Sequence, residues 1–432
     1  MSAVPVTEPV GLAGASAPHL VTELPGPNAR EWIARDLRVT SPSMGRVYPV
    51  VPARAAGLVI EDVDGNRFLD FNAGIAVTST GHCHPQVVEA IEQQARSLIH
   101  YCSSDFYPPV YAELCERLAA RAPMRAATKV FLTNSGTEAV EASLKLARHA
   151  TGRQFVVAFL GSFHGRSLGS LSLTASKAKY RAGFGPLLPG VHHAPYGEDG
   201  YLEDVLFRHL VTPDEVAAVF VEPIQGEGGY VVPPTGWLAR LRELCTEHGI
   251  LLVADEIQSG IGRTGKLWAI EHEGVEPDMV LSGKGIASGM PLGALIARAE
   301  LMQWGPGSHG STYGGNPVAC AAALATLDLV EGGLADHAAA MGARLTARLH
   351  ELQAHQPLLT DVRGRGLMVG VDFPSPELAY EVEQACFRRG LLVLTCGERA
   401  VRLAPALTVE AEHIATAVAV LEDACAEVAA TV

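Results

Sequence analysis

The sequence predicts an α/β protein in which a mostly parallel sheet is flanked by helices and joined to a smaller α+β domain. From about residue 129 onward, short apolar runs alternate with longer amphipathic stretches, the pattern of a parallel sheet covered by helices on both faces. Helix-capping signals stand between the runs. Beyond about residue 335 the order changes to a long amphipathic helix followed by mixed strand-like and helical segments, which indicates a second domain.

Individual helices and strands can be placed from these signals. Ser135 precedes an amphipathic stretch with Glu138 three residues later, which is a capping box. Asn316 is an N-cap residue before Pro317, and the helix that begins there is expected to end at the glycine pair 332–333. The expected strands of the large sheet are KVFLTN (129–134), VVAFL (156–160), VAAVFVEP (216–223), ILLVADE (250–256), DMVLSG (278–283) and GALIAR (293–298).

Changes of pattern divide the 432 residues into four regions. Residues 1–25 have no period and should form a loose tail. Residues 26–75 contain a hairpin signal at Asp64-Gly65 and should associate with the small domain. Residues 76–335 should form the large α/β domain, and residues 336–432 should form the C-terminal small α+β domain.

The composition excludes several classes of protein. Hydrophobic residues make up 48% and charged residues 19%, a balance typical of a compact folded protein. The formal net charge of −14 argues against nucleic acid and anionic membranes as partners, because both require a basic surface. The eight cysteines contain no C-x-x-C pair, so neither a metal site nor a disulfide framework is indicated, and reduced thiols of a cytoplasmic protein are expected.

Targeting and membrane-spanning signals are not expected either. The first twenty residues carry Glu8 but no Lys or Arg, and they lack the continuous apolar stretch of a signal peptide. The longest interval without charge, 301–327, is interrupted by several glycines and by Pro317. Such an interval is not expected to form a membrane-spanning helix.

The segment 260–266 matches two nucleotide-binding motifs, G-x-G-x-x-G and G-x-x-x-x-G-K. The P-loop interpretation fails because position 267 is Leu, which leaves no hydroxyl to bind Mg²⁺. The dinucleotide interpretation is weak because the preceding strand ends near Asp255, and Gly274 and Pro277 break the helix that should follow. A nucleotide-dependent oxidoreductase is therefore kept only as an alternative from a different class.

Three features at expected strand ends point to one kind of chemistry. Asp255 ends ILLVADE, at the edge where open α/β sheets bind ligands. Lys284 follows MVL among small residues, where shielding from water would make it an amine nucleophile. Residues 135–137 open a helix and offer N–H groups and two hydroxyls to a phosphate. Singly, these are also compatible with an ion pair, a loop cation and a helix cap. Together they match pyridoxal phosphate, which needs an anchor, a Schiff-base lysine and an acid beside its ring nitrogen.

These residues lie in stretches that resemble the class III (ω-amino acid) aminotransferases of pyridoxal-phosphate fold type I. The resemblance extends from about residue 25 to the C-terminus, and it implies that residues 76–335 bind pyridoxal 5'-phosphate. Eight ordered matches carry it: FNAGIAVTSTGHCHP (71–85), NSGTEAVEASLKLAR (134–148), FHGRSLG (163–169), EPIQGEGGY (222–230), ADEIQSGIGRTGKL (254–267), SGKGIASGMPLGA (282–294), STYGGNP (311–317) and LLVLTCGERAVRLAPALT (391–408).

The resemblance implies a role for each residue of the cofactor site. Lys284 would form the Schiff base and transfer the proton, and Asp255 would pair with the ring nitrogen. Phe163 would stack on the ring, and Gln258 would meet the ring hydroxyl. Thr312 would reach the phosphate of the neighbouring subunit, which implies a homodimer or dimer-based oligomer with shared active sites. The full set of expected cofactor-binding residues is Ser135, Gly136, Thr137, Phe163, Asp255, Gln258, Lys284 and Thr312.

The resemblance also implies how a substrate is bound. In the 4-aminobutyrate branch, Arg166 would bind the distal carboxylate and Arg402 the α-carboxylate of glutamate. Glu227 would pair with Arg402 when the substrate has no α-carboxylate, and would move aside for glutamate. Glu222 and Ile75 are further expected substrate-binding residues. Without the resemblance, both arginines would be interpreted as ordinary surface or salt-bridge residues.

The expected function is transfer of an amino group from a 4-aminobutyrate-like ω-amino acid to 2-oxoglutarate. Ile75, Val140 and the run at 394–397 look more like the 4-aminobutyrate branch than the acetylornithine or ornithine branch, which stays an alternative. The region from SLTASK to IQGEGGYVVPP also resembles amino-acid racemases of the same family. A racemase needs a proton donor on the opposite face of the substrate, and the sequence does not identify one, so racemisation stays open.

Overall fold

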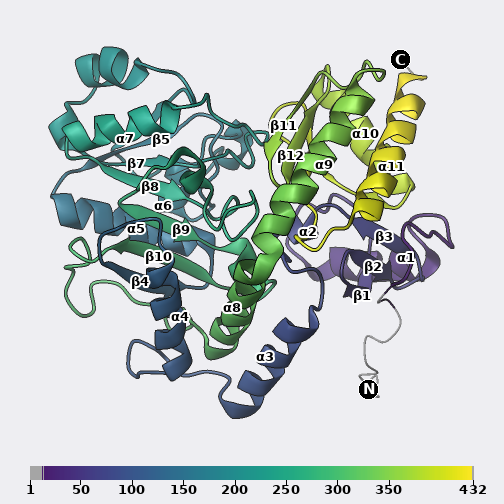
Figure 1. Cartoon of the computed structure of the whole chain (residues 1–432), viewed down its shortest axis with the longest axis horizontal. Helices are drawn as coiled ribbons and strands as arrows, with labels where there is room; N and C mark the ends of the chain where they lie inside the picture. Colours follow the sequence, from purple (N-terminus) through teal and green to yellow (C-terminus); the bar gives the residue numbers. More distant parts are fainter. Residues whose placement is uncertain (1–11, 13, 431–432) are drawn as a thin grey trace.

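A seven-stranded sheet forms the centre of the larger domain in the computed structural model, which describes residue 12 and residues 14–430 (Figure 1). β10 runs antiparallel to both of its neighbours and the other pairs are parallel, so the mostly parallel sheet is confirmed. In spatial order the strands are β4 (Thr128–Thr133), β10 (Gly293–Arg298), β9 (Met279–Ser282), β8 (Leu251–Asp255), β7 (Val216–Val221), β5 (Phe155–Phe159) and β6 (Val191–Ala194). All except β6 overlap the expected runs.

Helices cover both faces of this sheet because its central strands are apolar on both faces. Every residue of β7 and β8 is buried. Phe220 and Val253 pack in one core cluster with residues of α5 (Gly136–Thr151). Their neighbours Val219 and Leu252 pack in another cluster, with residues of α7 (Trp237–Glu247). Since successive strand residues point to opposite faces, α5 and α7 lie on opposite sides of the sheet.

The smaller domain is an antiparallel sheet with helices, as the sequence predicts for its C-terminal part. Its strand order is β11-β12-β15-β14. The elements are α9 (Ala335–Gln353), β11 (Asp361–Arg365), β12 (Met368–Asp372), α10 (Pro376–Arg388), β14 (Leu394–Cys396), β15 (Ala400–Leu403) and α11 (Ala411–Ala429). In Figure 1 this domain lies to the right of the large sheet.

The N-terminal segment lies beside the C-terminal one. β1 (Pro52–Ala56), β2 (Val59–Asp62) and β3 (Arg67–Asp70) form an antiparallel sheet, and β3 pairs in parallel with β13 (Leu391–Leu392). The β2–β3 hairpin turns at Gly65, whose φ of 87° favours glycine, as its sequence signal predicts. Helix α1 (Pro27–Val39) precedes this sheet. The purple and yellow ends of the ribbon accordingly adjoin in Figure 1.

Part of the expected N-terminal tail, residues 1–11 and 13, lies outside the described residues. Further along, His19 exchanges two backbone hydrogen bonds with Arg67, with N···O distances of 2.9 and 2.8 Å. The side-chain oxygen of Asn66 accepts a hydrogen bond from the Val21 N–H group at 2.8 Å. This stretch is therefore attached to the start of β3.

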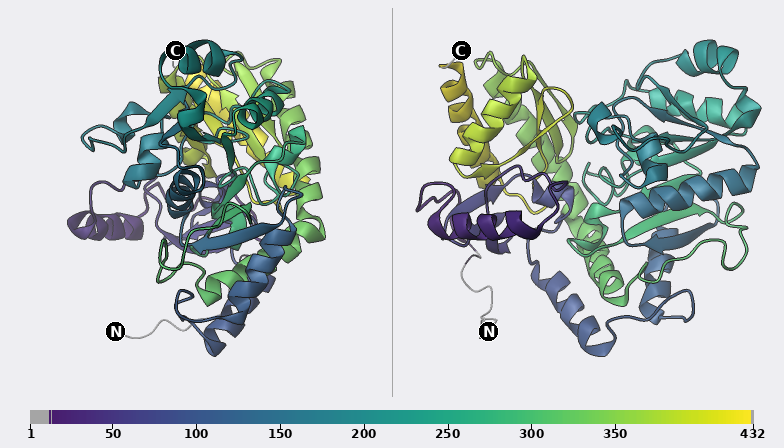
Figure 2. Two further views of the ribbon diagram at one scale, coloured as in Figure 1. Left: turned by 90° about the vertical axis from the view of Figure 1, so that its left-hand side faces the viewer. Right: turned by 180° about the vertical axis from the view of Figure 1, so that it is seen from behind.

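A long helical segment connects the two domains (Figure 2). It starts at α8 (Pro317–Leu329), where the Asn316 side chain accepts from two backbone N–H groups, so the predicted cap is confirmed. The predicted end at residues 332–333 agrees with the structure: helical turns continue past α8, but Gly333 has a non-helical φ of 133° and marks the kink between this helix and α9. The combined helix is long and apolar enough to cross a membrane, but half of its most apolar stretch is buried. Packing against α3 (Pro85–Ser97) and α4 (Pro109–Ala120) accounts for that apolar character.

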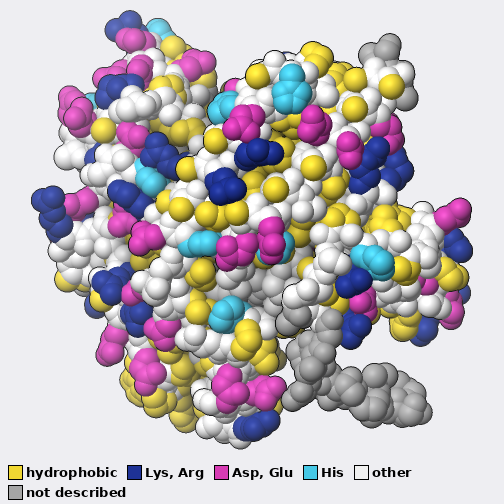
Figure 3. Space-filling model, turned by 45° about the vertical axis from the view of Figure 1, so that its right-hand side comes forward, with side chains coloured by type: hydrophobic (Ala, Val, Ile, Leu, Met, Phe, Trp, Pro, Cys, Tyr) yellow, Lys and Arg dark blue, Asp and Glu magenta, His cyan; other side chains and the backbone are white. Residues whose placement is uncertain are grey.

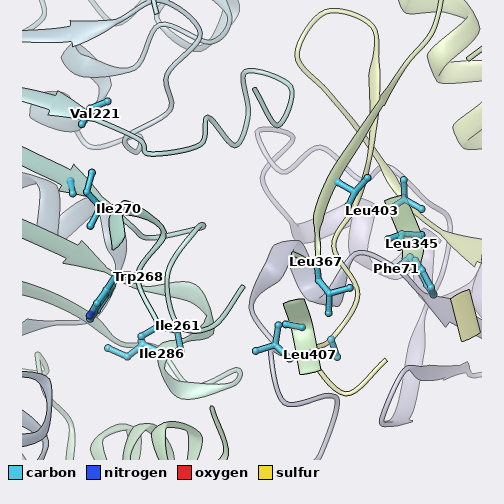
Figure 4. Close-up of a cluster of buried hydrophobic side chains, with 14 of the residues drawn as sticks. Phe71, Val221, Ile261, Trp268, Ile270, Ile286, Leu345, Leu367, Leu403 and Leu407 are labelled. Carbon is cyan, nitrogen blue, oxygen red and sulfur yellow. The ribbon is translucent and has the colours of Figure 1, made fainter. Parts of the chain in front are cut away.

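The two domains share a hydrophobic core. One cluster of contacting buried side chains includes residues from both domains. Figure 4 labels members from the large domain (Val221, Ile261, Trp268, Ile270 and Ile286) and members from the small-domain side (Phe71, Leu345, Leu367, Leu403 and Leu407). The domains are therefore packed together and not merely tethered.

The loop with the two nucleotide-binding motifs, residues 260–265, is packed against this interface. A Cβ atom on Gly262 would lie 2.9 Å from Val330, and one on Gly265 would lie 2.7 Å from Ala339. Arg263 is 1% exposed and donates a hydrogen bond to the Leu367 carbonyl oxygen at 3.2 Å. Because protein atoms already fill the space beside these glycines, the loop cannot cradle a phosphate, and nucleotide binding finds no support here.

Charged side chains of both signs are intermixed on the face shown in Figure 3. The eight cysteines, all within the described chain, are free.

Candidate active site

A cavity of about 310 Å³ lies at the carboxyl edge of the large sheet. It is formed by the segments that follow β4, β5, β7, β8 and β9, whose carboxyl ends meet at this edge. Its lining consists of Ser135, Gly136, Thr137, Phe163, His164, Gly165, Arg166, Glu222, Asp255, Ile257, Gln258 and Lys284. The fold thus brings together most of the residues expected to bind cofactor and substrate.

Lys284 is partly buried in the cavity wall directly after β9. Its φ of 44° lies in the left-handed region, which is unusual for a lysine and keeps it at the first position of a short turn, Lys284–Ala287. The Nζ atom makes no hydrogen bond to any residue that the structure describes. Burial lowers the pKa of its amine, partly offset by the charge of Glu227. The amine is therefore less strongly protonated than an exposed lysine, as a nucleophile or base requires.

Asp255 is the last residue of β8 and is 3% exposed. Its Oδ2 atom lies 2.6 Å from Nδ1 of His164, and its Oδ1 accepts from the Ile257 N–H group at 3.1 Å. Burial lowers the pKa of His164, but the hydrogen bond to Asp255 and its charge outweigh burial and leave that pKa raised. The hydrogen bond from His164 fixes the orientation of the Asp255 carboxylate in the cavity.

His164 was not among the expected site residues. Its pairing with Asp255 spans 91 positions of sequence, and no local pattern reveals such a contact. The available signal was its place next to Phe163 in the FHGRSLG stretch. Its Nε2 atom is buried without a hydrogen-bond partner in the described chain.

The N-terminus of α5 forms a polar cradle on the cavity wall. The Thr137 hydroxyl lies 2.7 Å from that of Ser167 and 2.6 Å from that of Ser170. A Cβ atom on Gly136 would lie 2.8 Å from Ile257, so only glycine fits this approach. The first N–H groups of a helix have no partner within the helix and are available to an anion.

The capping box predicted at this helix start is only half formed. The Ser135 hydroxyl accepts from the Glu138 N–H group at 3.4 Å, as expected. The Glu138 carboxylate, however, accepts from the Asn134 N–H group at 2.8 Å and from its side-chain amide at 3.0 Å, instead of from Ser135.

Glu222 follows β7 and connects two loops of the cavity wall. Its carboxylate accepts from the N–H groups of Phe163 and Gly226, each at 3.0 Å. Burial raises its pKa to about 7. Gln258 lies against Gly226, and its buried Oε1 atom has no partner in the described chain. An unsatisfied buried acceptor in a cavity is suited to a ligand that donates a hydrogen bond.

Arg402 on β15 of the small domain makes a hydrogen-bonded ion pair with Glu227 in the loop after β7. Burial raises the pKa of Glu227, but the charge of Arg402 more than reverses this and leaves it lowered. The pKa of Arg402 is raised, because Glu227 outweighs burial. Gly226, which precedes Glu227, lies against Gln258 of the cavity wall, and the charges of both residues act on Lys284, so the pair lies beside the cavity.

Arg166 is exposed at the rim, with its guanidinium 4.3 Å from the ring centroid of Tyr180 and 5.8 Å from that of Phe163. Four expected residues are not among those that line the cavity of the single chain: Glu227 and Arg402, which lie beside it, and Ile75 and Thr312. Ile75 is 43% exposed in a left-handed turn, α2 (Ala73–Ala76), with φ of 68°. Thr312 is exposed in the loop before α8.

Known proteins resemble this chain in sequence and in fold. The family model described as Aminotransferase class-III matches residues 40–425. A 4-aminobutyrate aminotransferase of Mycobacterium leprae is 41% identical, covering 93% of this chain and 97% of the relative. An alanine/serine racemase of Pyrococcus horikoshii is 39% identical, with coverage of 94% and 92%. An acetylornithine aminotransferase of Methanopyrus kandleri is 45% identical, with coverage of 87% and 94%. The crystal structure of an ornithine aminotransferase from Toxoplasma gondii superposes with a TM-score of 0.86 at 33% identity, covering 94% of this chain and 96% of that one.

Proposed function

The chain belongs to the class-III aminotransferase family, and we propose that it transfers the amino group of a 4-aminobutyrate-like ω-amino acid to 2-oxoglutarate. The observation that carries this proposal is the Glu227–Arg402 ion pair beside the cavity, together with Arg166 at the rim, which makes no ion pair with the described residues. Two separate cations can then bind two carboxylates, and one of these cations can be neutralised. That arrangement suits a reaction whose two amino acids carry one and two carboxylates.

Enzymes of this family depend on pyridoxal phosphate, and the cavity fits it. The helix N-terminus with Thr137 supplies donors for the phosphate, and Asp255 would hold a proton on the ring nitrogen. The unsatisfied Gln258 Oε1 and the unpartnered Lys284 Nζ face the same space. When bound, this cofactor supplies an electron sink for the carbon that bears the amino group.

Catalysis by the chain itself would consist of binding and proton transfer. Lys284 Nζ would take the proton from the carbon that bears the amine and return it during the second half of the reaction. Phe163 would cover one face of the ring. His164 would keep Asp255 in place through the 2.6 Å hydrogen bond, and Glu222 would hold the Phe163 loop.

Substrate carboxylates would be bound by the two arginines. Arg166 would hold the distal carboxylate of either amino acid in a charge-assisted hydrogen bond. With an ω-amino acid, Arg402 stays paired with Glu227. With glutamate, the α-carboxylate would replace Glu227 as its partner. Ile75 would contact the substrate, because its exposed side chain is free to meet a ligand.

The active enzyme would be a homodimer or a dimer-based oligomer. Thr312 is exposed and does not line the cavity of its own chain. This is expected of a residue that completes the site of a neighbouring subunit. Large apolar side chains are also exposed near it: Tyr313 (62%) follows Thr312 in sequence, and Ile99 (65%), whose carbonyl oxygen accepts from the Asn316 side chain, lies beside the same loop. We also propose a cytoplasmic location, because the eight free cysteines fit a compartment in which thiols stay reduced.

Racemisation is a second candidate function. The observation that favours it is the 39% identity to the alanine/serine racemase over most of both chains. Transfer from N-acetylornithine or ornithine also stays possible, given the relatives of those names.

One panel experiment separates these functions. The holoenzyme is incubated with 4-aminobutyrate, 5-aminovalerate, N-acetylornithine, ornithine, L-alanine and L-serine, each with and without 2-oxoglutarate, while glutamate and enantiomer composition are measured. We expect glutamate to form with the highest kcat/KM from 4-aminobutyrate or 5-aminovalerate. A higher kcat/KM for N-acetylornithine, or D-amino acid formation without 2-oxoglutarate, would refute the proposal.

A further inference from the structure

Among the residues that the structure describes, the guanidinium of Arg166 contacts two aromatic rings. Its central carbon lies 4.3 Å from the ring centroid of Tyr180 and 5.8 Å from that of Phe163. It makes no hydrogen bond or ion pair with any residue that the structure describes. A contact through the face of the guanidinium leaves its in-plane N–H groups free for a carboxylate. Tyr180 thus supports Arg166 without occupying its hydrogen-bond donors.

Tyr180 is itself held at this position. It ends a short 3-10 turn, Ala178–Tyr180, whose last N–H group donates to the Lys177 carbonyl oxygen at 3.1 Å. Its ring meets that of Phe163 edge to face, with centroids 5.9 Å apart and planes inclined by 81°. A T-shaped contact of this kind favours one orientation of the tyrosine ring.

Tyr180 also lies within electrostatic reach of the second carboxylate-binding group. Burial raises the pKa of its phenol, the charge of Glu227 raises it further, and Arg166 and Arg402 lower it less, so the phenol is neutral near pH 7. A neutral ring beside Arg166 can support it without forming an ion pair, whereas an acidic residue in its place would compete with the substrate carboxylate.

We propose that Tyr180 is a positioning residue that holds Arg166 ready for the distal carboxylate of the substrate, and that it thereby sets the preference for carboxylate-bearing donors. This inference rests on the proposed function and deepens it. A free arginine side chain has many rotamers, and ordering it on binding costs conformational entropy. The ring contact restricts that freedom before the substrate arrives, so Tyr180 acts on substrate affinity and not on proton transfer.

Two variants separate the ring from its hydroxyl. Tyr180→Leu removes the aromatic face but keeps an apolar side chain, whereas Tyr180→Phe keeps the aromatic face. We expect Tyr180→Leu to raise KM for 4-aminobutyrate by about 3- to 30-fold, the range of a cation–π contact, with kcat within about twofold. Tyr180→Phe should keep both constants within about twofold of the wild type.

Binding of glutarate, an unreactive dicarboxylate, gives a readout that does not depend on turnover. Its Kd by calorimetry on the holoenzyme should rise by the same factor in Tyr180→Leu. In an Arg166→Ala background, Tyr180→Leu should change Kd no further, because the arginine through which it acts is gone. Thermal unfolding and cofactor absorbance check that each variant is folded and loaded.

Three results would overturn the inference: an unchanged glutarate Kd in Tyr180→Leu, an equal loss in Tyr180→Phe, or an undiminished effect in the Arg166→Ala background. Failure of the proposed function looks different. In that case the wild-type enzyme itself does not convert 4-aminobutyrate or 5-aminovalerate, while glutarate binding still tests Tyr180.

Discussion

Arg402 and Glu227 form a buried ion pair that joins the two domains. Arg402 belongs to β15 of the small domain, and the Glu227 carbonyl oxygen accepts from the Gly397 N–H group of the same domain at 2.8 Å. Removing one member of a buried pair leaves the other charge uncompensated, which is costlier than losing an exposed pair. Whatever displaces Glu227 must therefore supply a negative charge to Arg402, and an α-carboxylate does so.

Glu227→Gln should slow the half-reaction with 4-aminobutyrate and leave the glutamate half-reaction within about threefold of wild type. The amide keeps the shape of Glu227 but leaves the Arg402 charge unpaired when the donor has no α-carboxylate. A charge-assisted contact of about 1.5 to 3 kcal/mol corresponds to roughly 10- to 150-fold in rate. Arg402→Ala should show the opposite selectivity. Single-turnover absorbance measures each half-reaction, and equal losses in both would rule out the exchange of partners.

Lys284→Ala should abolish turnover while the protein stays folded. The amine is in the cavity wall, has no hydrogen-bond partner in the described chain and has a lowered pKa, so it is suited to act as nucleophile and base, and alanine removes it. Lys129→Ala, which changes an exposed lysine on β4, is the matched control and should keep full activity. Turnover is measured with 4-aminobutyrate and 2-oxoglutarate, and folding by circular dichroism. Near-wild-type turnover in Lys284→Ala would remove this residue from the mechanism.

Asp255→Asn should lower kcat by about 10² to 10⁴, the usual size of an electrostatic or proton-holding contribution. The amide cannot carry the charge that would keep the ring nitrogen protonated. It also removes the charge that raises the pKa of His164, so the histidine loses its proton more readily. Steady-state kinetics on the loaded enzyme provide the measurement. A rate within about threefold of wild type would make the carboxylate purely structural.

Much of the large domain could be predicted because its signals are local. The apolar runs that correspond to β5, β7, β8, β9 and β10 are continuous, because both faces of these strands are buried under helices. The cap at Asn316 could also be predicted locally, because an asparagine side chain accepts from the first N–H groups of a helix and proline favours the first helical position. The strand ends then placed Asp255 and Lys284 at one edge without further information.

The parts that could not be predicted depend on tertiary contacts. β6 contains His192 and His193 and lacks a continuous apolar run, so no sequence pattern predicts a strand there. The pairing of His164 with Asp255 and the placement of Tyr180 under Arg166 join segments that have no pattern in common.

The purified enzyme should be a dimer or a dimer-based oligomer at micromolar concentration. Thr312 is exposed on the loop before α8, and the proposal gives it a phosphate of the neighbouring subunit. Thr312→Ala should therefore weaken cofactor binding several-fold without dissociating the oligomer. Light scattering gives the mass, and absorbance during dialysis gives the loss of cofactor. A fully active monomer would contradict the shared site.

Glu256 gives a test of stability that is independent of substrate. It follows Asp255 and is fully buried, and its carboxylate accepts from the Ser259 hydroxyl at 2.6 Å and from the Ile270 N–H group at 2.7 Å. Burial raises its pKa from 4.5 to about 7. Between these two values the folded protein holds this proton more tightly than the unfolded chain does. The contribution of Glu256 to the free energy of unfolding is therefore fully present below about pH 4.5 and is lost as the pH rises through 7.

Glu256→Gln should remove this pH dependence. The amide is uncharged at every pH, its oxygen can still accept from Ile270, and its NH₂ group can donate to the Ser259 hydroxyl, which also accepts. Near pH 5 the variant and wild type should have similar free energies of unfolding. At pH 8 the variant should be more stable by up to about 3 kcal/mol, at ~1.4 kcal/mol per pKa unit. Urea unfolding from pH 5 to 8.5 measures the difference, with Glu243→Gln on the exposed side of α7 as the control. Glu222, whose pKa is also raised by burial, keeps its own slope in both proteins and cancels in the comparison. A difference in unfolding free energy that does not change with pH would show that Glu256 stays ionised inside the fold.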